Sequence, residues 1–219
     1  MFIHRHPYPP FLLENTSRLI VGTLPPPRFS TGELFKEDVD FCYGSKYGLL
    51  WPILDEIFKL DLLYENSSTA IEQRKTFLKK HKIGICDIVE SCAREKMDAS
   101  DLGMDSLITR NLVRVLEDQT SIELILLMGG MSTNGPGYLL TKQLQSHKIP
   151  FKIYSEGTIK TLEFNIKQRR VKAYALISPS SAANRAIGSF SFYRQRKSQN
   201  PDYTVMDFRI EQYRKVFLP

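Results

Sequence analysis

Four short segments of the sequence carry residue types that together could hold a flat polar molecule. Residues 22–27 place a glycine and a threonine ahead of three prolines, and residues 43–48 hold two tyrosines, two glycines, a serine and a lysine. Asp87 contributes a carboxylate, and residues 178–184 contribute three serines and an asparagine. An aromatic face, a carboxylate and several hydroxyls are typical of a pocket that fixes the orientation of such a ligand.

The apolar pattern predicts the elements that would position these segments. Strands are expected at residues 18–22, 83–89, 122–128 and 171–177, with a short one at 150–154, and helices at 49–60, 69–80, 106–116, 138–147 and 205–217. Alternating strands and helices predict an α/β fold, namely a three-layer α/β/α sandwich around a central, mostly parallel four-stranded sheet. Because the carboxyl ends of parallel strands meet at one edge, where open α/β sheets bind ligands, we expect the four segments to converge on one pocket.

The domain organisation is expected to be simple. The sequence has no repeat, low-complexity tract or shift in composition that would mark a boundary, so residues 1–219 are expected to form a single domain. Residues 1–17 are expected to be an irregular N-terminal arm, because Pro7, Pro9 and Pro10 interrupt regular structure. Residues 157–170 alternate loosely between apolar and polar side chains and indicate a possible hairpin insertion.

Composition argues against several classes of protein. Cys42, Cys86 and Cys92 show no CxxC spacing, which disfavours a zinc ribbon, an iron–sulfur cluster or a disulfide framework and fits a reducing, cytoplasmic location. The four histidines show no metal-ligand spacing, and no apolar stretch approaches the ~20 residues that cross a bilayer. The formal net charge of +6 is compatible with nucleic-acid binding, although many other proteins are basic.

The same segments resemble motifs of the uracil-DNA glycosylase superfamily. They are Gly22-Thr23-Leu24-Pro25, YGSKYGLLWPIL at 43–54 and SPSSAAN at 178–184, in the order and rough spacing of that superfamily. Residues 85–92, ICDIVESC, are similar to a W-D-V-L-x-S-C segment of its hypoxanthine-DNA glycosylase-like branch. The sequence resembles this branch and the mismatch-specific (thymine/uracil) branch most, from residue 18 to about residue 217.

The resemblance implies a monofunctional DNA glycosylase, which flips a deaminated or mismatched base of the uracil/hypoxanthine class out of DNA and hydrolyses its N-glycosidic bond. It implies damaged or mismatched DNA as the partner and neither a metal nor an organic cofactor, and we expect a monomer. Tyr43 falls at the base-stacking position and Asp87 where the Watson–Crick edge of the base is read. The other base-binding positions are Gly22, Thr23, Leu24, Pro25 and Gly44. The positions that hold or wedge the DNA strand are Ser178, Pro179, Ser180, Ser181, Asn184 and Arg185, with Ile187 nearby.

The sequence departs from the superfamily at the positions that would activate water. The first motif of the superfamily has Asp or Asn two residues after its glycine, where this chain has Leu24. The His and Asn of the hypoxanthine branch's H-P-x-N segment align with Ser45 and Gly48, and the His of the second motif aligns with Ser178. The resemblance therefore assigns no catalytic residue, and Asp87, Ser45 and Asp40 are the candidates.

Structural interpretations of the same residues remain open. Asp87 could cap the next helix or pair with a lysine, Tyr43 could be a core aromatic, and the serines at 178–181 could cap a helix. Trp51 is expected in the core. Residues 129–137 are rich in glycine but lack the Lys-Ser/Thr of a P-loop, and they predict a strand-to-helix turn.

Two other functions fit the sequence. One is a catalytically weak or inactive relative that binds nucleic acid, which Leu24 and Gly48 favour. The other is an enzyme that acts on a nucleoside or nucleotide in the same pocket. The basic cluster at 194–197 could be a solvated face or a DNA contact. The second alternative gains if the basic loop at 185–197 does not face the mouth of the pocket.

Overall fold

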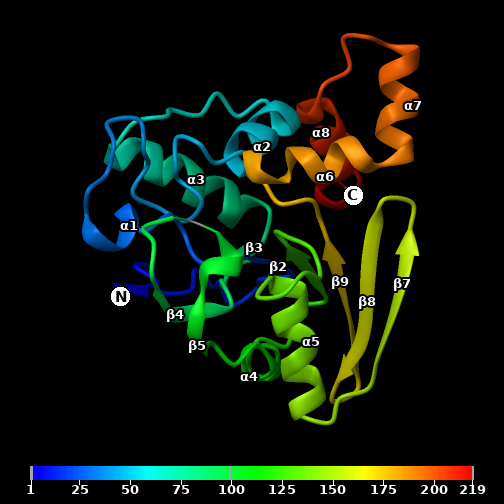
Figure 1. Ribbon diagram of the computed structural model, residues 1–219. Coiled ribbons are helices and arrows are strands. Elements are labelled where there is room, and N and C mark those ends of the chain that lie inside the picture. Colours follow the sequence, from blue (N-terminus) through cyan, green and yellow to red (C-terminus); the bar gives the residue numbers. More distant parts are fainter. Residues whose placement is uncertain (1, 99, 219) are drawn as a thin grey trace.

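The computed structural model describes residues 2–98 and 100–218, and a six-stranded sheet forms its centre (Figure 1). The strand order is β3-β2-β6-β9-β8-β7. The parallel strands are β2 (Arg18–Val21), β3 (Ile83–Ile85), β6 (Leu124–Leu127) and β9 (Arg169–Ala175). The antiparallel β8 (Ile159–Ile166) and β7 (Phe151–Glu156) extend the sheet beyond β9. The predicted α/β class with a mostly parallel sheet is confirmed, but the four expected strands are only the parallel part of a wider sheet.

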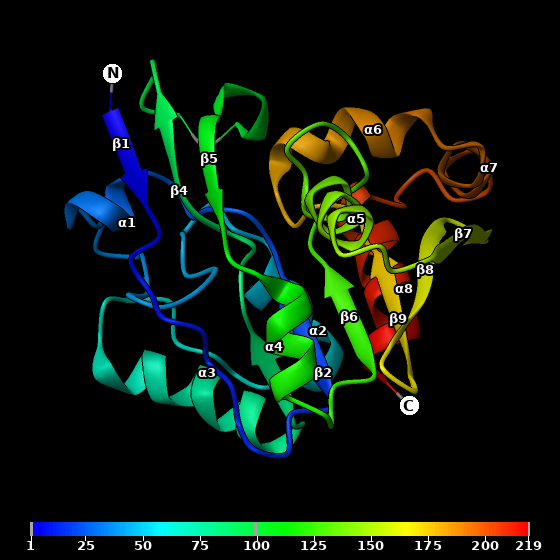
Figure 2. The ribbon, with the colours of Figure 1, turned by 90° about the horizontal axis from the view of Figure 1, so that it is seen from below.

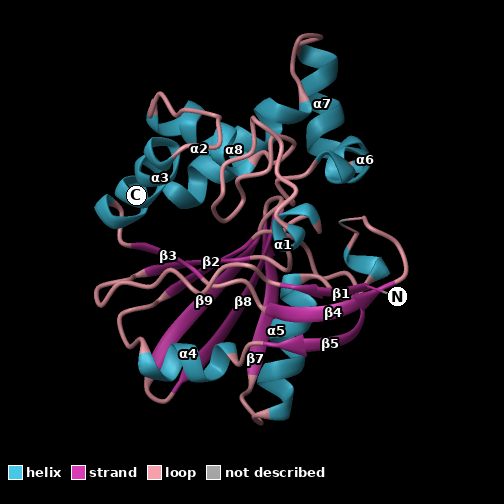
Figure 3. Cartoon of the chain, turned by 90° about the vertical axis from the view of Figure 1, so that its left-hand side faces the viewer, coloured by secondary structure: helices cyan, strands magenta, loops and turns pink. Residues whose placement is uncertain are grey.

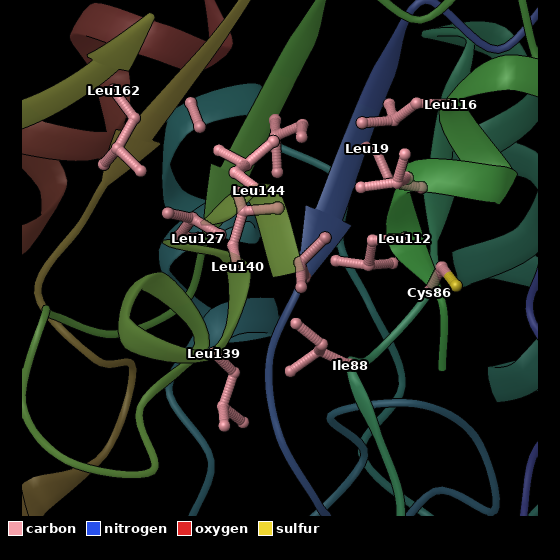
Figure 4. Packing of buried hydrophobic residues seen from close by; sticks show 14 of the residues in the cluster. Leu19, Cys86, Ile88, Leu112, Leu116, Leu127, Leu139, Leu140, Leu144 and Leu162 are labelled. Carbon is pink, nitrogen blue, oxygen red and sulfur yellow. The ribbon is translucent and has the colours of Figure 1, made fainter. Parts of the chain in front are cut away.

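Helices cover both faces of this sheet, which gives three layers (Figure 3). On one face lie α2 (Leu50–Phe58), α3 (Ser68–Lys80) and α8 (Val205–Phe217), and on the other lie α4 (Leu112–Asp118) and α5 (Pro136–Ser146). Successive side chains of a strand point to opposite faces. Leu19 accordingly packs on the α4 and α5 side, as Figure 4 shows, whereas Ile20 packs on the α2, α3 and α8 side. A strand that buries both faces must be apolar throughout, as the run at 19–21 is.

Several helices begin where local side chains satisfy the free N–H groups of the first turn. The Thr204 hydroxyl accepts from the Asp207 N–H while the Asp207 carboxylate accepts from the Thr204 N–H, so α8 begins at the expected residue. At α3 a single hydrogen bond serves as the cap, since the Ser67 hydroxyl accepts from the Ala70 N–H. The shorter helices are α1 (Arg28–Thr31), η1 (Asp101–Gly103), η2 (Ser181–Ala183), α6 (Asn184–Ser189) and α7 (Ser191–Gln199).

A second, three-stranded antiparallel sheet lies beside the first (Figure 2). It consists of β1 (Phe2–Arg5), β4 (Val89–Arg94) and β5 (Asp105–Thr109), in the order β1-β4-β5. The expectation of an irregular arm over 1–17 was therefore wrong for the first residues of the arm, which form β1. The single strand expected at 83–89 is also two strands, because the chain leaves the main sheet after Ile85 and enters the second sheet at Val89.

Two further segments differ from expectation. The helix expected at 106–116 begins only at Leu112, where Asn111 caps it, and the residues before it form β5. Residues 157–170 form no separate insertion, since β8 pairs with β7 on one side and with β9 on the other. In both segments, pairing with the strands next to them in the sequence decides the conformation.

The second sheet contains a buried histidine and a buried arginine side by side. His4 is fully buried, and its Nδ1 accepts a hydrogen bond from Arg94 Nε at 2.9 Å. Its Nε2 has no hydrogen-bond partner among residues 2–98 and 100–218. Burial first, and then the charge of Arg94, lowers the pKa of His4 to about 4. His4 is therefore neutral in the folded protein.

We expect His4 to make the stability of the fold depend on pH. The unfolded chain takes up a proton at the ordinary histidine pKa of 6.5 and the folded chain only near 4, so stability is full above pH 6.5 and falls between the two values. The loss should reach about 3 kcal/mol at pH 4. In His4→Asn the amide oxygen can still accept from Arg94, and this part of the dependence should vanish. Urea unfolding of both proteins from pH 7.5 to 4.5 measures it, and parallel curves would contradict the prediction.

Candidate functional site

A cavity of about 890 Å³ opens at the carboxyl ends of β2, β6 and β9, within the size range of small-molecule sites. It is lined by parts of the four segments that the sequence singled out. The predicted site residues in its wall are Gly22, Thr23, Leu24, Pro25, Tyr43, Gly44, Ser45, Asp87, Ser178, Pro179, Ser180 and Ser181. The remaining wall includes His6, Tyr8, Met97, Ser100, Asp101 and Met128. The structure thus brings the four segments together, as the sheet topology predicts.

Asp87 takes part in three hydrogen bonds at the cavity wall. Its Oδ1 accepts from the Gly22 N–H at 2.7 Å and from the Tyr43 hydroxyl at 2.8 Å, and its Oδ2 lies 3.1 Å from His6 Nε2. The residue is only 7% exposed. Asp87 therefore neither caps a helix nor pairs with a lysine. It joins the first loop, the Tyr43 loop and the N-terminal segment, and both of its oxygens are engaged.

Close packing holds Tyr43 against Asp87. A Cβ atom added to Gly22 would lie 2.2 Å from the Tyr43 hydroxyl oxygen, so only glycine leaves room for this contact. Tyr43 has φ 60°, a left-handed conformation that is unfavourable for a bulky residue and persists only where its surroundings enforce it. Burial, and then the charge of Asp87, raises the pKa of the phenol far above its ordinary value. The hydroxyl consequently stays protonated and donates to the carboxylate.

A buried ion pair organises the loop that carries Tyr43 and Ser45. Asp38 is fully buried, and Arg28 donates to both of its oxygens, from Nε at 2.7 Å and from Nη2 at 2.8 Å. The N–H groups of Phe35 and Lys46 also donate to it. Burial alone would raise the pKa of Asp38, but the bonds from Arg28, Lys46 and Phe35 outweigh it and hold that pKa below its ordinary value. Asp38 is thus a structural carboxylate.

The other two catalytic candidates differ in position. The Ser45 hydroxyl lines the cavity, where it accepts from Arg28 Nη2 at 2.7 Å and from the Tyr47 N–H at 3.2 Å. Asp40 lies outside the cavity wall, is exposed, and accepts from the Tyr8 hydroxyl at 2.7 Å. Of the candidates, the structure therefore places Ser45 and Asp87 in the wall and Asp40 outside it.

The serine loop after β9 is held from behind by Arg209 of α8. This fully buried guanidinium donates to the carbonyl oxygens of Ser178, at 3.3 Å, and Ser180, at 2.7 Å. The Pro179 carbonyl accepts from the Leu49 N–H at 2.9 Å, which ties the loop to the start of α2. The Ser180 hydroxyl accepts from the Ala182 N–H, so one serine does cap a short helix. The backbone of this loop is fixed, while the Ser181 side chain remains exposed.

The residues expected to wedge into DNA differ in their exposure. Asn184 and Arg185 begin α6, are exposed, and lie just beyond the part of the chain that lines the cavity. Ile187 is fully buried against Tyr203 and Phe208, so its expected role as a wedge was wrong.

His6 and Asp101 are among the cavity residues that the sequence did not single out. His6 arrives from the N-terminal segment to contact Asp87, and Asp101 accepts from the Thr23 hydroxyl at 2.7 Å. Burial, and then the Asp87 charge, raises the pKa of Asp101, although Thr23 and Arg94 oppose the shift. Neither residue lies in a recognisable motif. Leu24 and Gly48 also line the cavity and bring no polar side chain to it.

Neither a metal centre nor a membrane span is found in the described part of the chain. Residues 2–98 and 100–218 contain no group of three or more His, Cys, Asp or Glu side chains that could hold a metal ion. Over the same residues, no helix is both long and apolar enough to cross a membrane.

We expect Gly22→Ala to displace Tyr43 from Asp87. The added methyl group must push the phenol or the loop away, and overpacking of this kind costs about 1–3 kcal/mol. Thermal unfolding should show a lower midpoint than that of the wild type. Gly130→Ala is the matched control, because a Cβ there meets no atom within 4 Å. Equal stability of the two variants would contradict the prediction.

We expect Asp38→Asn to destabilise the protein by about 3 kcal/mol, because it leaves the Arg28 guanidinium without its carboxylate. The pKa of Asp38 is lowered in the folded state, so its contribution is present above the ordinary value of 3.8 and is lost as pH falls through the folded value. Urea unfolding should give a constant difference from wild type between pH 8 and 5 that shrinks below pH 4. Asp118→Asn, at an exposed pair on α4, should change little.

The chain was compared with known proteins. No protein-family model matches it, and no curated protein matches it. Among solved structures it is similar to a protein from Methanosarcina acetivorans, determined by solution NMR and described as a "putative Uracil DNA glycosylase". The TM-score is 0.58 at 20% sequence identity, over 99% of this chain and 97% of that chain. This chain therefore shares the fold of that protein along almost its whole length.

Proposed function

We propose that this chain belongs to the uracil-DNA glycosylase superfamily and is a DNA glycosylase. It would flip a deaminated or mismatched base, of the uracil/hypoxanthine class, into the cavity and hydrolyse its N-glycosidic bond. One observation carries the proposal: parts of all four segments that resemble the superfamily line the same cavity, at the carboxyl edge of the sheet. The similarity in fold to the Methanosarcina protein supports it.

Tyr43 is the proposed stacking platform for the base. Its ring borders the cavity and is half-buried, and its hydroxyl is held by Asp87. A ring that is already fixed loses little conformational freedom when a base stacks on it, and such stacking contributes about 1–3 kcal/mol per base. Asp87 would act mainly by fixing this ring and the first loop, because both of its oxygens already have protein partners.

The DNA strand is proposed to lie over the serine loop and the helices that follow it. Arg185 of α6 and Arg194, Arg196 and Lys197 of α7 are exposed, and α7 projects from the body of the protein (Figure 1). The segment runs on directly from η2, whose residues line the cavity. Basic side chains on the segment that follows η2 would neutralise phosphates on either side of a flipped nucleotide.

The test is a single-turnover cleavage assay with enzyme in excess over labelled DNA. Duplex and single-stranded oligonucleotides would carry uracil, hypoxanthine, xanthine or a G·T mismatch, and alkali would reveal abasic sites. We expect cleavage of at least one of these bases. Tyr43→Ala should reduce the rate about 10- to 100-fold through the loss of stacking, whereas Tyr43→Phe, which keeps the ring, should lose less.

Tyr154→Ala, on the edge strand β7 outside the cavity, is the matched control and should cleave like wild type. Equal rates for the Tyr43→Ala and Tyr154→Ala variants would reject the stacking role. A wild-type protein that cleaves no base but binds DNA in a salt-dependent way would instead be the inactive binding relative, which the apolar Leu24 and the bare Gly48 favour. Neither cleavage nor binding would leave an enzyme for a nucleoside or nucleotide.

A further inference from the structure

The cavity wall contains three acidic residues, and they differ in what occupies their oxygens. Asp87 is engaged by His6, Gly22 and Tyr43. Glu33 is exposed and accepts from the Thr31 hydroxyl. Asp101 accepts only from Thr23, through Oδ1, and its Oδ2 receives no hydrogen bond from a side chain of residues 2–98 and 100–218. Asp101 is thus a half-buried carboxylate with one oxygen available to a molecule in the cavity.

Asp101 is held in place from two directions. Thr23, which donates to its carboxylate, is the residue directly before Leu24, where the resembling motif has its water-positioning Asp or Asn. From the other direction, the Asn134 amide donates to the carbonyl oxygens of Asp101, at 3.1 Å, and of Met104, at 3.0 Å. Asn134 belongs to the glycine-rich turn after β6 and has φ 62°. The turn thereby anchors η1 beside the first loop.

The second sheet completes this support. Arg94 of β4 donates from Nη1 to the Ser100 carbonyl at 2.6 Å, and its Nε donates to the buried His4 of β1. The segment that carries Asp101 is therefore fixed by β4, by the turn after β6 and by the loop after β2. Such fixation is what a reacting group needs, because a displacement of about 1 Å can cost about 100-fold in rate.

We infer that Asp101 is the catalytic carboxylate of this cavity and replaces the acid or amide that Leu24 lacks. The inference rests on the proposed glycosylase function. The bond between C1′ and the base nitrogen breaks, and its electron pair leaves with the base, which takes a proton from solvent. The oxygen of a water molecule bonds to C1′, and the Asp101 carboxylate accepts the proton that this water loses. Before that transfer, the negative charge of Asp101 stabilises the positive charge that develops on the sugar.

The surroundings of the Asp101 carboxylate suit a general base, that is, a group that accepts a proton. The titratable and charged groups that face it are Arg94 and Cys92 of β4 and Asp87 of the β3–β4 connection. Burial and the charge of Asp87 raise its pKa, and a carboxylate of raised pKa is a stronger proton acceptor. Because the carboxylate must be ionised to act, the cleavage rate should fall as pH decreases through this pKa.

The first test is cleavage by Asp101→Asn under single-turnover conditions. General-base catalysis contributes about 10²- to 10⁴-fold, so we expect a loss of that size, and the acid limb of the pH–rate profile should disappear from the residual activity. In Asp101→Ala, added formate should restore part of the rate, which a merely structural role would not allow. Asp105→Asn, an exposed aspartate at the start of β5, is the matched control and should retain full activity.

The competing carboxylate is tested by Glu33→Gln in the same assay. A rate for Asp101→Asn within about threefold of wild type would overturn the inference while leaving the proposed function intact. So would a large loss in Glu33→Gln with none in Asp101→Asn. Circular dichroism and thermal unfolding of every variant would show that the differences do not arise from misfolding.

A binding measurement tests the position of Asp101 without requiring that the protein cleave a base. Two duplexes would carry either a neutral tetrahydrofuran abasic analogue or a cationic pyrrolidine analogue, which resembles the charged sugar of the transition state. We expect wild type to prefer the pyrrolidine duplex at least about tenfold and Asp101→Asn to lose the preference. If no base is cleaved but this pattern is found, the proposed activity fails and the position of Asp101 at the sugar stands. A preference absent from wild type, or retained in Asp101→Asn, overturns the inference.

Discussion

The buried carboxylate of Asp87 joins parts of the chain that are far apart in sequence. It accepts from a ring nitrogen 81 residues away, a backbone N–H 65 residues away and a phenol 44 residues away. A buried carboxylate is stable only while its hydrogen bonds are complete, so the three donors must be placed together or not at all. The position of the first loop, the left-handed Tyr43 and the entry of the N-terminal segment all depend on this one group.

Two buried arginines hold other loops of the cavity wall in place. Arg209 binds carbonyl oxygens of the serine loop, and Arg94 binds the Ser100 carbonyl of the segment before η1. In each case a charged side chain inside the protein donates hydrogen bonds to backbone carbonyl oxygens of an irregular loop. The cavity is therefore a set of loops made rigid by charges beneath them, and its shape is set before any ligand arrives.

The parts of the fold that were predictable carry their signal locally. The apolar run at 19–21 marks a strand buried on both faces, and the Thr204–Asp207 pair marks the start of α8. The apolar positions of 105–109 fit either helix or strand, and pairing with β4 decides between them. In the cavity, segments at strand ends were predictable from topology. His6 and Asp101 were not, because their place depends on contacts with residues more than 75 positions away.

The pairing of β1 has a consequence for how the chain folds. Phe2 pairs with Arg94 and Ile3 with Ala93, and Phe11 forms a bridge with Ile85 at the edge of β3. During synthesis, the residues of β1 therefore have no pairing strand until about ninety further residues have left the ribosome. Closing so long a loop carries an entropic cost that local contacts do not offset, so this pairing should form late in folding. The wall that brings His6 to the cavity would then be among the last parts to assemble and, by the same reasoning, among the first to open.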